Sequence, residues 1–191
     1  MKRLSDRIWE TSKTRMYTER RLLSQATTTE LLLIWYSLFL VAASIWLLCA
    51  PATFPTYLTV VGSISVLVAS VYLSARNYRA RAVQIRNNYV SLAGLESRAR
   101  SAEGAGDQDE LRTVEETYRD KLADVENHTE YDYLCLRFSR RWDDSTTLPR
   151  FRWGDWVAFL WAKSWRYCFL LVLVAFPLAL ASALARIGKG P

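Results

Sequence analysis

Two neighbouring uncharged segments, residues 31–50 and 56–75, dominate the pattern of apolar and polar positions. A helix rises about 1.5 Å per residue, so each segment is long enough to cross the roughly 30 Å apolar core of a bilayer. The residues between them, Pro51-Ala52-Thr53-Phe54-Pro55, are too few for a domain, and the prolines favour a sharp reversal. The pattern predicts a transmembrane helical hairpin over residues 31–75. Two buried helices of a soluble protein are the alternative, but core helices are rarely apolar all round over this length.

A basic, amphipathic helix is predicted over residues 1–30, ahead of the hairpin. The positions near one of its faces are Ile8, Trp9, Ser12, Met16, Arg20 and Leu23. Such a helix lies on a membrane surface or packs on other cytoplasmic helices. A solvated helix whose charge serves only membrane topology is an equally weighted alternative.

A pair of cytoplasmic helices is predicted over residues 76–138. The helix of the second span is expected to continue past Ala75, since residues 75–100 contain no proline and apolar residues recur at helical spacing. Residues 98–109 are expected to form a turn or linker, with Gly104 and Gly106 as breakers. The second helix is predicted over residues 109–127. Its apolar stripe consists of Leu111, Val114, Tyr118, Leu122 and Val125. The two helices are expected to pack antiparallel.

The carboxyl-terminal part divides into a linker, residues 139–152, and a tryptophan-rich segment with a third membrane helix, residues 153–191. Four tryptophans fall within residues 153–165 beside basic side chains, a composition typical of the lipid headgroup region. The apolar run over residues 167–185 is long enough to span, and Pro177 should kink it. A re-entrant or interfacial helix is the alternative. The predicted fold is an all-α membrane protein: a transmembrane hairpin continuing into a cytoplasmic helical pair, plus a third membrane helix, assembled as an oligomer.

The charge distribution predicts the topology. The net charge is +6, and basic residues flank the outer ends of the hairpin, whereas residues 51–55 carry no charge. The positive-inside rule then places the amino terminus and the helical pair in the cytoplasm, and the carboxyl terminus outside. Anionic lipid is the expected partner of the basic clusters. Nucleic-acid binding ranks second as an explanation of the charge.

Two sets of candidate functional residues follow from these patterns. Hydroxyl residues share one face of the second span, at Thr59, Ser63, Ser70 and Ser74. Helix packing is the default explanation of such a stripe, and the lining of an oligomeric pore is the other. Basic side chains that could meet an anionic trigger are Arg15, Arg20, Arg21, Arg79 and Arg86. Topology and lipid contact explain any single one of them more simply.

No pattern of catalytic or metal-binding residues stands out. The three cysteines, Cys49, Cys135 and Cys168, have no close partner in sequence, so neither a disulfide framework nor a zinc site is expected. The single histidine, His128, fits hydrogen bonding or helix capping better than catalysis. We therefore expect no enzyme activity, no metal and no cofactor.

Short motifs around the hairpin resemble the SLATT family, the SMODS and SLOG-associating two-transmembrane effector domains of bacterial defence systems. Before the hairpin come Trp9, Thr11 and Arg15, and then Glu19-Arg20-Arg21-Leu22. After it come Glu126-Asn127-His128 and then Asp132-Tyr133. The order of these motifs around a hairpin is more specific than any one of them.

The resemblance implies a membrane effector of the bacterial inner membrane that is not an enzyme. The role it implies is a pore that depolarises the cell during phage infection, a form of abortive infection. The trigger would be a nucleotide, a nucleic acid or a protein, from a partner such as a nucleotidyltransferase or reverse transcriptase. The motif positions expected to be structural or trigger-sensing are Trp9, Asn127, His128, Asp132 and Tyr133. A non-conducting membrane scaffold that recruits a cytoplasmic partner is the alternative function.

Overall fold

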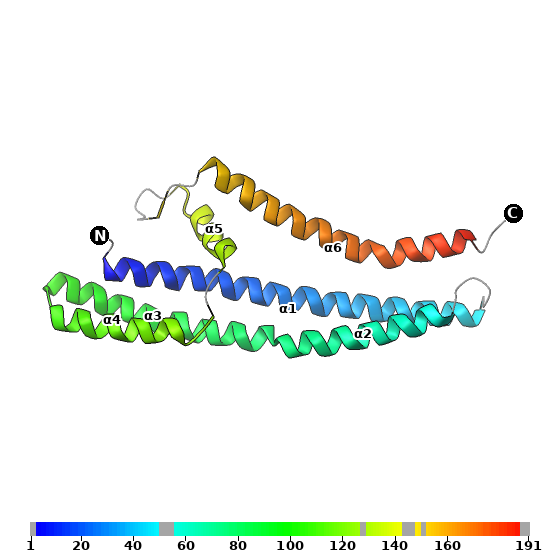
Figure 1. Ribbon diagram of the computed structural model, residues 1–191, viewed down its shortest axis with the longest axis horizontal. Helices are drawn as coiled ribbons and strands as arrows, with labels where there is room; N and C mark the ends of the chain where they lie inside the picture. Colours follow the sequence, from blue (N-terminus) through cyan, green and yellow to red (C-terminus); the bar gives the residue numbers. More distant parts are fainter. Residues whose placement is uncertain (1–2, 50–55, 127–128, 143–147, 150–151, 188–191) are drawn as a thin grey trace. The chain divides into compact units, whose positions relative to one another are not determined.

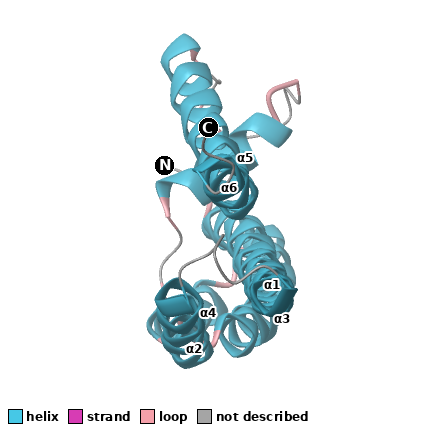
Figure 2. Ribbon diagram, turned by 90° about the vertical axis from the view of Figure 1, so that its right-hand side faces the viewer, coloured by secondary structure: helices cyan, strands magenta, loops and turns pink. Residues whose placement is uncertain are grey.

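The computed structural model describes residues 3–49, 56–126, 129–142, 148–149 and 152–187, and within them every regular element is a helix (Figure 2). The helices, labelled in Figure 1, are α1 (Leu4–Cys49), α2 (Thr56–Arg76), α3 (Tyr78–Ala105), α4 (Gln108–Ala123), α5 (Glu130–Ser139) and α6 (Trp153–Ile187). They form two compact units. The helical bundle comprises Met1–Ser24 and Tyr78–Ala162, and the membrane unit comprises Gln25–Asn77 and Lys163–Pro191.

The bundle core forms where the first part of α1 packs on α3 and α4. Ile8 of α1 is fully buried against Leu92 and Leu95 of α3 and against Val114 and Tyr118 of α4. A second cluster joins Leu22 of α1 to Ala82 and Ile85 of α3. Burying an aliphatic side chain of this size contributes about 1.5–3 kcal/mol. The predicted face of residues 1–30 is correct for Ile8 and Ser12, which are buried, and wrong for Arg20 and Leu23, which are exposed. Among the alternatives for that helix, the structure shows packing on other helices.

Helices α3 and α4 pack on each other, but the linker predicted over residues 98–109 is wrong. The structure continues α3 to Ala105, because Ala99 and Ala102 are buried in the bundle and Gly104 lies in open space within the helix. The turn is confined to Gly106 and Asp107. Gly106 has φ +72°, a conformation that glycine adopts at little cost. The Asp107 carboxylate then caps α4 by accepting from the backbone N–H groups of Asp109 and Glu110 at 3.1 and 3.0 Å.

The helix that was expected to run unbroken from the second span is interrupted at Asn77. Its φ of 50° lies in the left-handed region, which asparagine tolerates better than most residues. This residue separates α2 from α3 and ends the membrane unit, since α3 belongs to the bundle.

Helix α5 was not predicted from the sequence as a separate element. Its signal is a capping box in Thr129-Glu130-Tyr131-Asp132. The Thr129 side chain accepts from the Asp132 backbone N–H, and the Asp132 carboxylate accepts from the Thr129 backbone N–H at 3.1 Å. At its other end, Phe138 stacks on Phe159 of α6, with ring centroids 4.6 Å apart. The bundle therefore uses the start of α6, and the tryptophan-rich segment and the third apolar segment form one helix.

Three helical segments of the described chain are long and apolar enough to cross a membrane, which agrees with the predicted spans. Of their most apolar stretches only 0, 6 and 6% is buried within the chain, so lipid or other protein must cover the remainder. Inside the membrane unit, α2 approaches α1 at Gly62. A Cβ atom at this position would lie 2.7 Å from Cδ2 of Leu40, so the glycine makes room for the leucine.

Candidate functional sites in the bundle and membrane helices

The Asp132 carboxylate is the centre of a polar network in the bundle. It is 1% exposed and pairs with Arg21 of α1, whose Nε and Nη2 atoms donate to it at 2.9 and 3.1 Å. The Thr18 hydroxyl donates to Asp132 at 3.0 Å and the Thr129 hydroxyl at 2.9 Å. Because every buried carboxylate needs such partners, this network ties the start of α5 to α1. The motif residues Arg21 and Asp132 therefore share one structural contact.

Arg15, one of the candidate trigger contacts, lies in the interior of the bundle. Its side chain is 1% exposed, and Nη1 donates to Asn88 Oδ1 of α3. Further donations reach the backbone carbonyl oxygens of Lys121, at 3.2 Å, and Leu122, at 3.4 Å. These carbonyls belong to the last turn of α4, which has free acceptors and the negative end of the helix dipole.

Burial lowers the pKa of Arg15, and the neighbouring Tyr118 and Asp124 oppose that shift. The position gives Arg15 a structural role, because its guanidinium caps the carboxyl-terminal end of α4. A ligand could reach the guanidinium only by displacing these contacts.

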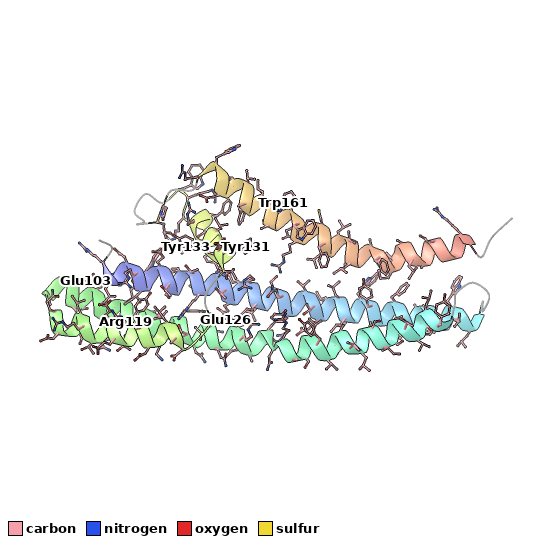
Figure 3. The ribbon with its side chains drawn as sticks, in the orientation of Figure 1. Glu103, Arg119, Glu126, Tyr131, Tyr133 and Trp161 are labelled. Carbon is pink, nitrogen blue, oxygen red and sulfur yellow. The ribbon has the colours of Figure 1, made fainter. Side chains whose placement is uncertain are left out.

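The motif residues Trp9 and Tyr133 lie on facing parts of α1 and α5. The Arg140 guanidinium stands 5.6 Å from the Trp9 ring centre, a cation–π contact. Burial raises the pKa of Tyr133, and the nearby Glu10 carboxylate raises it further. Tyr133, labelled in Figure 3, also lines a small pocket of about 210 Å³ together with Glu10, Thr11 and other residues. The other two motif residues, Asn127 and His128, lie outside the described residues.

The remaining candidate trigger residues, Arg20, Arg79 and Arg86, are exposed. The Arg20 guanidinium stands 5.5 Å from the ring centre of Tyr17 on the same helix. The five predicted basic residues are thus divided: Arg15 is buried, Arg21 pairs with Asp132, and three lie on the surface.

The hydroxyl stripe of α2 lies beside the surface that α2 turns toward α1. Ser63, Ser70 and Ser74 are exposed, whereas Thr59 is 8% exposed. The Ser63 hydroxyl donates to the backbone carbonyl of Thr59 at 2.8 Å. At 3.6 residues per turn, the stripe is centred roughly a quarter turn around the helix from Gly62, Val66 and Leu73. Those three residues line an apolar groove of about 510 Å³ shared with α1 and α6.

No group of three or more histidine, cysteine, aspartate or glutamate side chains in the described residues could hold a metal ion. The polar clusters of the bundle join arginine, asparagine, threonine and aspartate in contacts between helices, an arrangement that stabilises the bundle.

The comparison with family models decides the identity of this set of helices and motifs. The model of SMODS and SLOG-associating 2TM effector domain family 5 matches residues 1–184. The chain belongs to the SLATT family. Searches of curated proteins and of solved structures gave no match.

SLATT domains are two-transmembrane effector domains associated with defence systems, and they are not a known enzyme family. The family name itself states an association with SMODS and SLOG partners. The SLATT match extends over the third apolar helix, α6, although the family description counts two transmembrane helices. The resemblance drawn from the motifs around the hairpin is confirmed, and the chain is a membrane protein.

Sequence reasoning did not identify Thr18 and Asn88 as polar partners in the bundle. Their detectable signal is a polar residue at a position of the apolar stripe, since Asn88 falls three residues after Ile85 and four before Leu92. The partners of Arg15 in α4 could not be identified from the sequence, because they are backbone carbonyls, which every residue carries.

Proposed function

We propose that the protein is a pore-forming effector of a bacterial anti-phage defence system that depolarises the inner membrane when it is triggered. Membership of a defence-associated effector family supports a membrane role. The basic bundle lies in the cytoplasm in this proposal, and the carboxyl terminus lies in the periplasm, as the positive-inside rule favours.

The exposed serine stripe of α2 is the observation that carries the pore proposal. The apolar stretches of the three spans are almost wholly unburied within one chain, so other copies can cover them. Several α1–α2 hairpins packed around an axis would turn Ser63, Ser70 and Ser74 inward, where hydroxyl groups can contact water. Thr59 is buried, so in this proposal it contacts the neighbouring helices and does not line the pore.

The bundle is the proposed trigger sensor. Arg20, Arg79 and Arg86 are exposed and could contact an anionic nucleotide, nucleic-acid product or lipid headgroup. The trigger would come from a defence partner such as a nucleotidyltransferase or a reverse transcriptase. It would act by binding one of two states of the bundle more tightly, since a ligand shifts an equilibrium only by its differential affinity.

The test compares the double variant Ser63→Leu/Ser70→Leu with Val68→Leu/Val71→Leu. The control changes two exposed residues of the same helix outside the stripe. Both would be expressed with the genomic neighbours and challenged with phage, while a potential-sensitive dye reports the membrane potential. Ion flux through the purified, reconstituted proteins would be recorded in parallel, and cross-linking would report the oligomer.

Loss of depolarisation and of ion flux in the serine variant alone would support the stripe as the pore lining. Unchanged conductance with an intact oligomer would remove the stripe from the pore. A steady potential in the unaltered protein, despite membrane insertion and an active trigger, would favour a non-conducting scaffold. The exposed aromatic residues of the bundle, among them Trp142 and Trp153 at 84% exposure each, would then be the first surface to examine for a partner.

A further inference from the structure

Helix α6 has a backbone defect inside the membrane unit at Pro177. Proline has no N–H group, so the carbonyl four residues earlier, that of Leu173, receives no hydrogen bond from within the helix. The ring also disturbs the neighbouring turn and bends the helix. In the apolar core of a bilayer no water replaces the missing donor, and an unsatisfied carbonyl carries a large free-energy penalty.

Two consecutive residues of α1 supply donors at this defect. The Tyr36 hydroxyl donates to the carbonyl oxygen of Leu173 at 2.8 Å, and the Trp35 indole Nε1 donates to that of Val174 at 3.2 Å. The acceptor of Tyr36 is thus the carbonyl that Pro177 deprives of its partner. Pro177 itself is less than 2% exposed, and it lines the same groove as Tyr36.

We propose that Trp35 and Tyr36 form a latch that recognises the Pro177 kink and keeps α6 docked on α1 within the membrane unit. The kink and the latch depend on each other. Without the proline, the Leu173 carbonyl would bond within α6 and would not need Tyr36. Without Tyr36, the kinked helix would expose that carbonyl to lipid. Undocking of α6 therefore requires another donor for Leu173, which makes the docked and undocked arrangements two discrete states.

The latch does not depend on the pore proposal, because it concerns only how the third helix is held. It applies equally to a conducting effector and to a non-conducting scaffold. Its test is therefore a distance measurement and not an assay of depolarisation.

The docked population can be measured by electron–electron double resonance on the full chain in lipid nanodiscs. Spin labels would be placed at Leu38 of α1 and Leu178 of α6, which are 60% and 56% exposed, so that the labels do not enter the contact. The native cysteines to be replaced by serine first are Cys49, Cys135 and Cys168. The labelled parent protein should give one narrow distance distribution.

The double variant Trp35→Phe/Tyr36→Phe removes both donors: Tyr36→Phe takes away only the hydroxyl, whereas Trp35→Phe keeps an aromatic side chain but replaces the indole with a smaller ring. We expect the ratio of docked to undocked α6 to fall about 5- to 30-fold, the effect of losing polar contacts between membrane helices. The matched control is Tyr72→Phe, a tyrosine of α2 whose hydroxyl bonds Arg76 one turn along the same helix. The control should leave the distance distribution unchanged.

Pro177→Ala supplies the decisive comparison. Alanine restores the N–H group, so Trp35→Phe/Tyr36→Phe should then change the distribution little relative to Pro177→Ala alone. If the double variant leaves the parent distribution unchanged, there is no latch. If it loosens α6 equally with proline or alanine at position 177, the contact is an ordinary one and recognition of the kink is refuted.

Discussion

Asp132→Ala tests whether the buried carboxylate holds α5 on α1. The substitution removes the acceptor of Arg21, Thr18 and Thr129 and breaks the capping box at the start of α5. The side chain of Arg21 is 19% exposed, so without Asp132 its guanidinium would be an unpaired charge with little contact to water. The variant should therefore unfold the bundle more easily without touching the membrane unit.

The magnitude follows from the contacts. Breaking a buried ion pair costs about 3–5 kcal/mol, and the partial exposure of Arg21 favours the lower end of that range. Loss of the cap adds about 1 kcal/mol. We expect Asp132→Ala to lower the free energy of unfolding by about 3–4 kcal/mol, and Asp132→Asn, which keeps the size and some acceptor capacity, by about 2 kcal/mol.

Urea-dependent pulse proteolysis of the full chain in nanodiscs would measure this effect. With an m-value of about 1–3 kcal/mol per molar urea, the midpoint for Asp132→Ala should fall by about 1–4 M. The control Asp120→Asn changes an exposed carboxylate of α4 and should shift the midpoint little. Combined with Arg21→Gln in a double-mutant cycle, the pair should couple by at least about 1 kcal/mol. A midpoint for Asp132→Ala within about 0.3 M of the parent, or a coupling energy near zero, would refute the proposed network.

Three further outcomes are expected. Arg15→Met should destabilise the bundle by about 2 kcal/mol or more, because it leaves buried carbonyls of α4 without a donor. The control Arg20→Met, at an exposed position, should cost less than about 0.5 kcal/mol, and the urea midpoints of the two variants would be compared. Glu103 is labelled in Figure 3. Burial raises the pKa of its carboxyl group, but hydrogen bonds from Ser5 outweigh this and leave the pKa below its ordinary value. The Glu103 carboxylate therefore stabilises the fold above its unfolded pKa of about 4.3, and this contribution is lost as the pH falls through the lower folded pKa. Glu103→Gln should accordingly make the urea midpoint depend less on pH in that acidic range. Gly62→Ala should be tolerated because the end of Leu40 can rotate away, whereas Gly62→Leu should lower stability by about 1–3 kcal/mol, seen as a lower thermal aggregation midpoint in detergent.

The sequence by itself determined the elements whose cause is local or periodic. Uncharged runs of about 20 residues predict spans regardless of what they pack against. The stripe that includes Val114 and Tyr118 is periodic within its own helix, so the packing of α3 on α4 was predictable. The capping box at Thr129 is equally local, since its residues lie within four positions of the sequence, but it was not recognised there. The extension of α3 through Gly104 could not be predicted from the sequence, because burial of Ala99 and Ala102 overrides the weak helix propensity of glycine.

Only the tertiary structure decided what the polar side chains do. From the sequence, Arg15 and Arg20 are equivalent basic residues, yet one is buried at the end of α4 and the other is on the surface. The sequence gives the Tyr36 hydroxyl no partner, whereas in the structure it donates to the Leu173 carbonyl that Pro177 leaves without a hydrogen bond. In both cases the partner is a backbone carbonyl more than 100 residues away in the chain. Every residue carries such a carbonyl, so only the fold determines which carbonyl lacks a donor and which side chain reaches it.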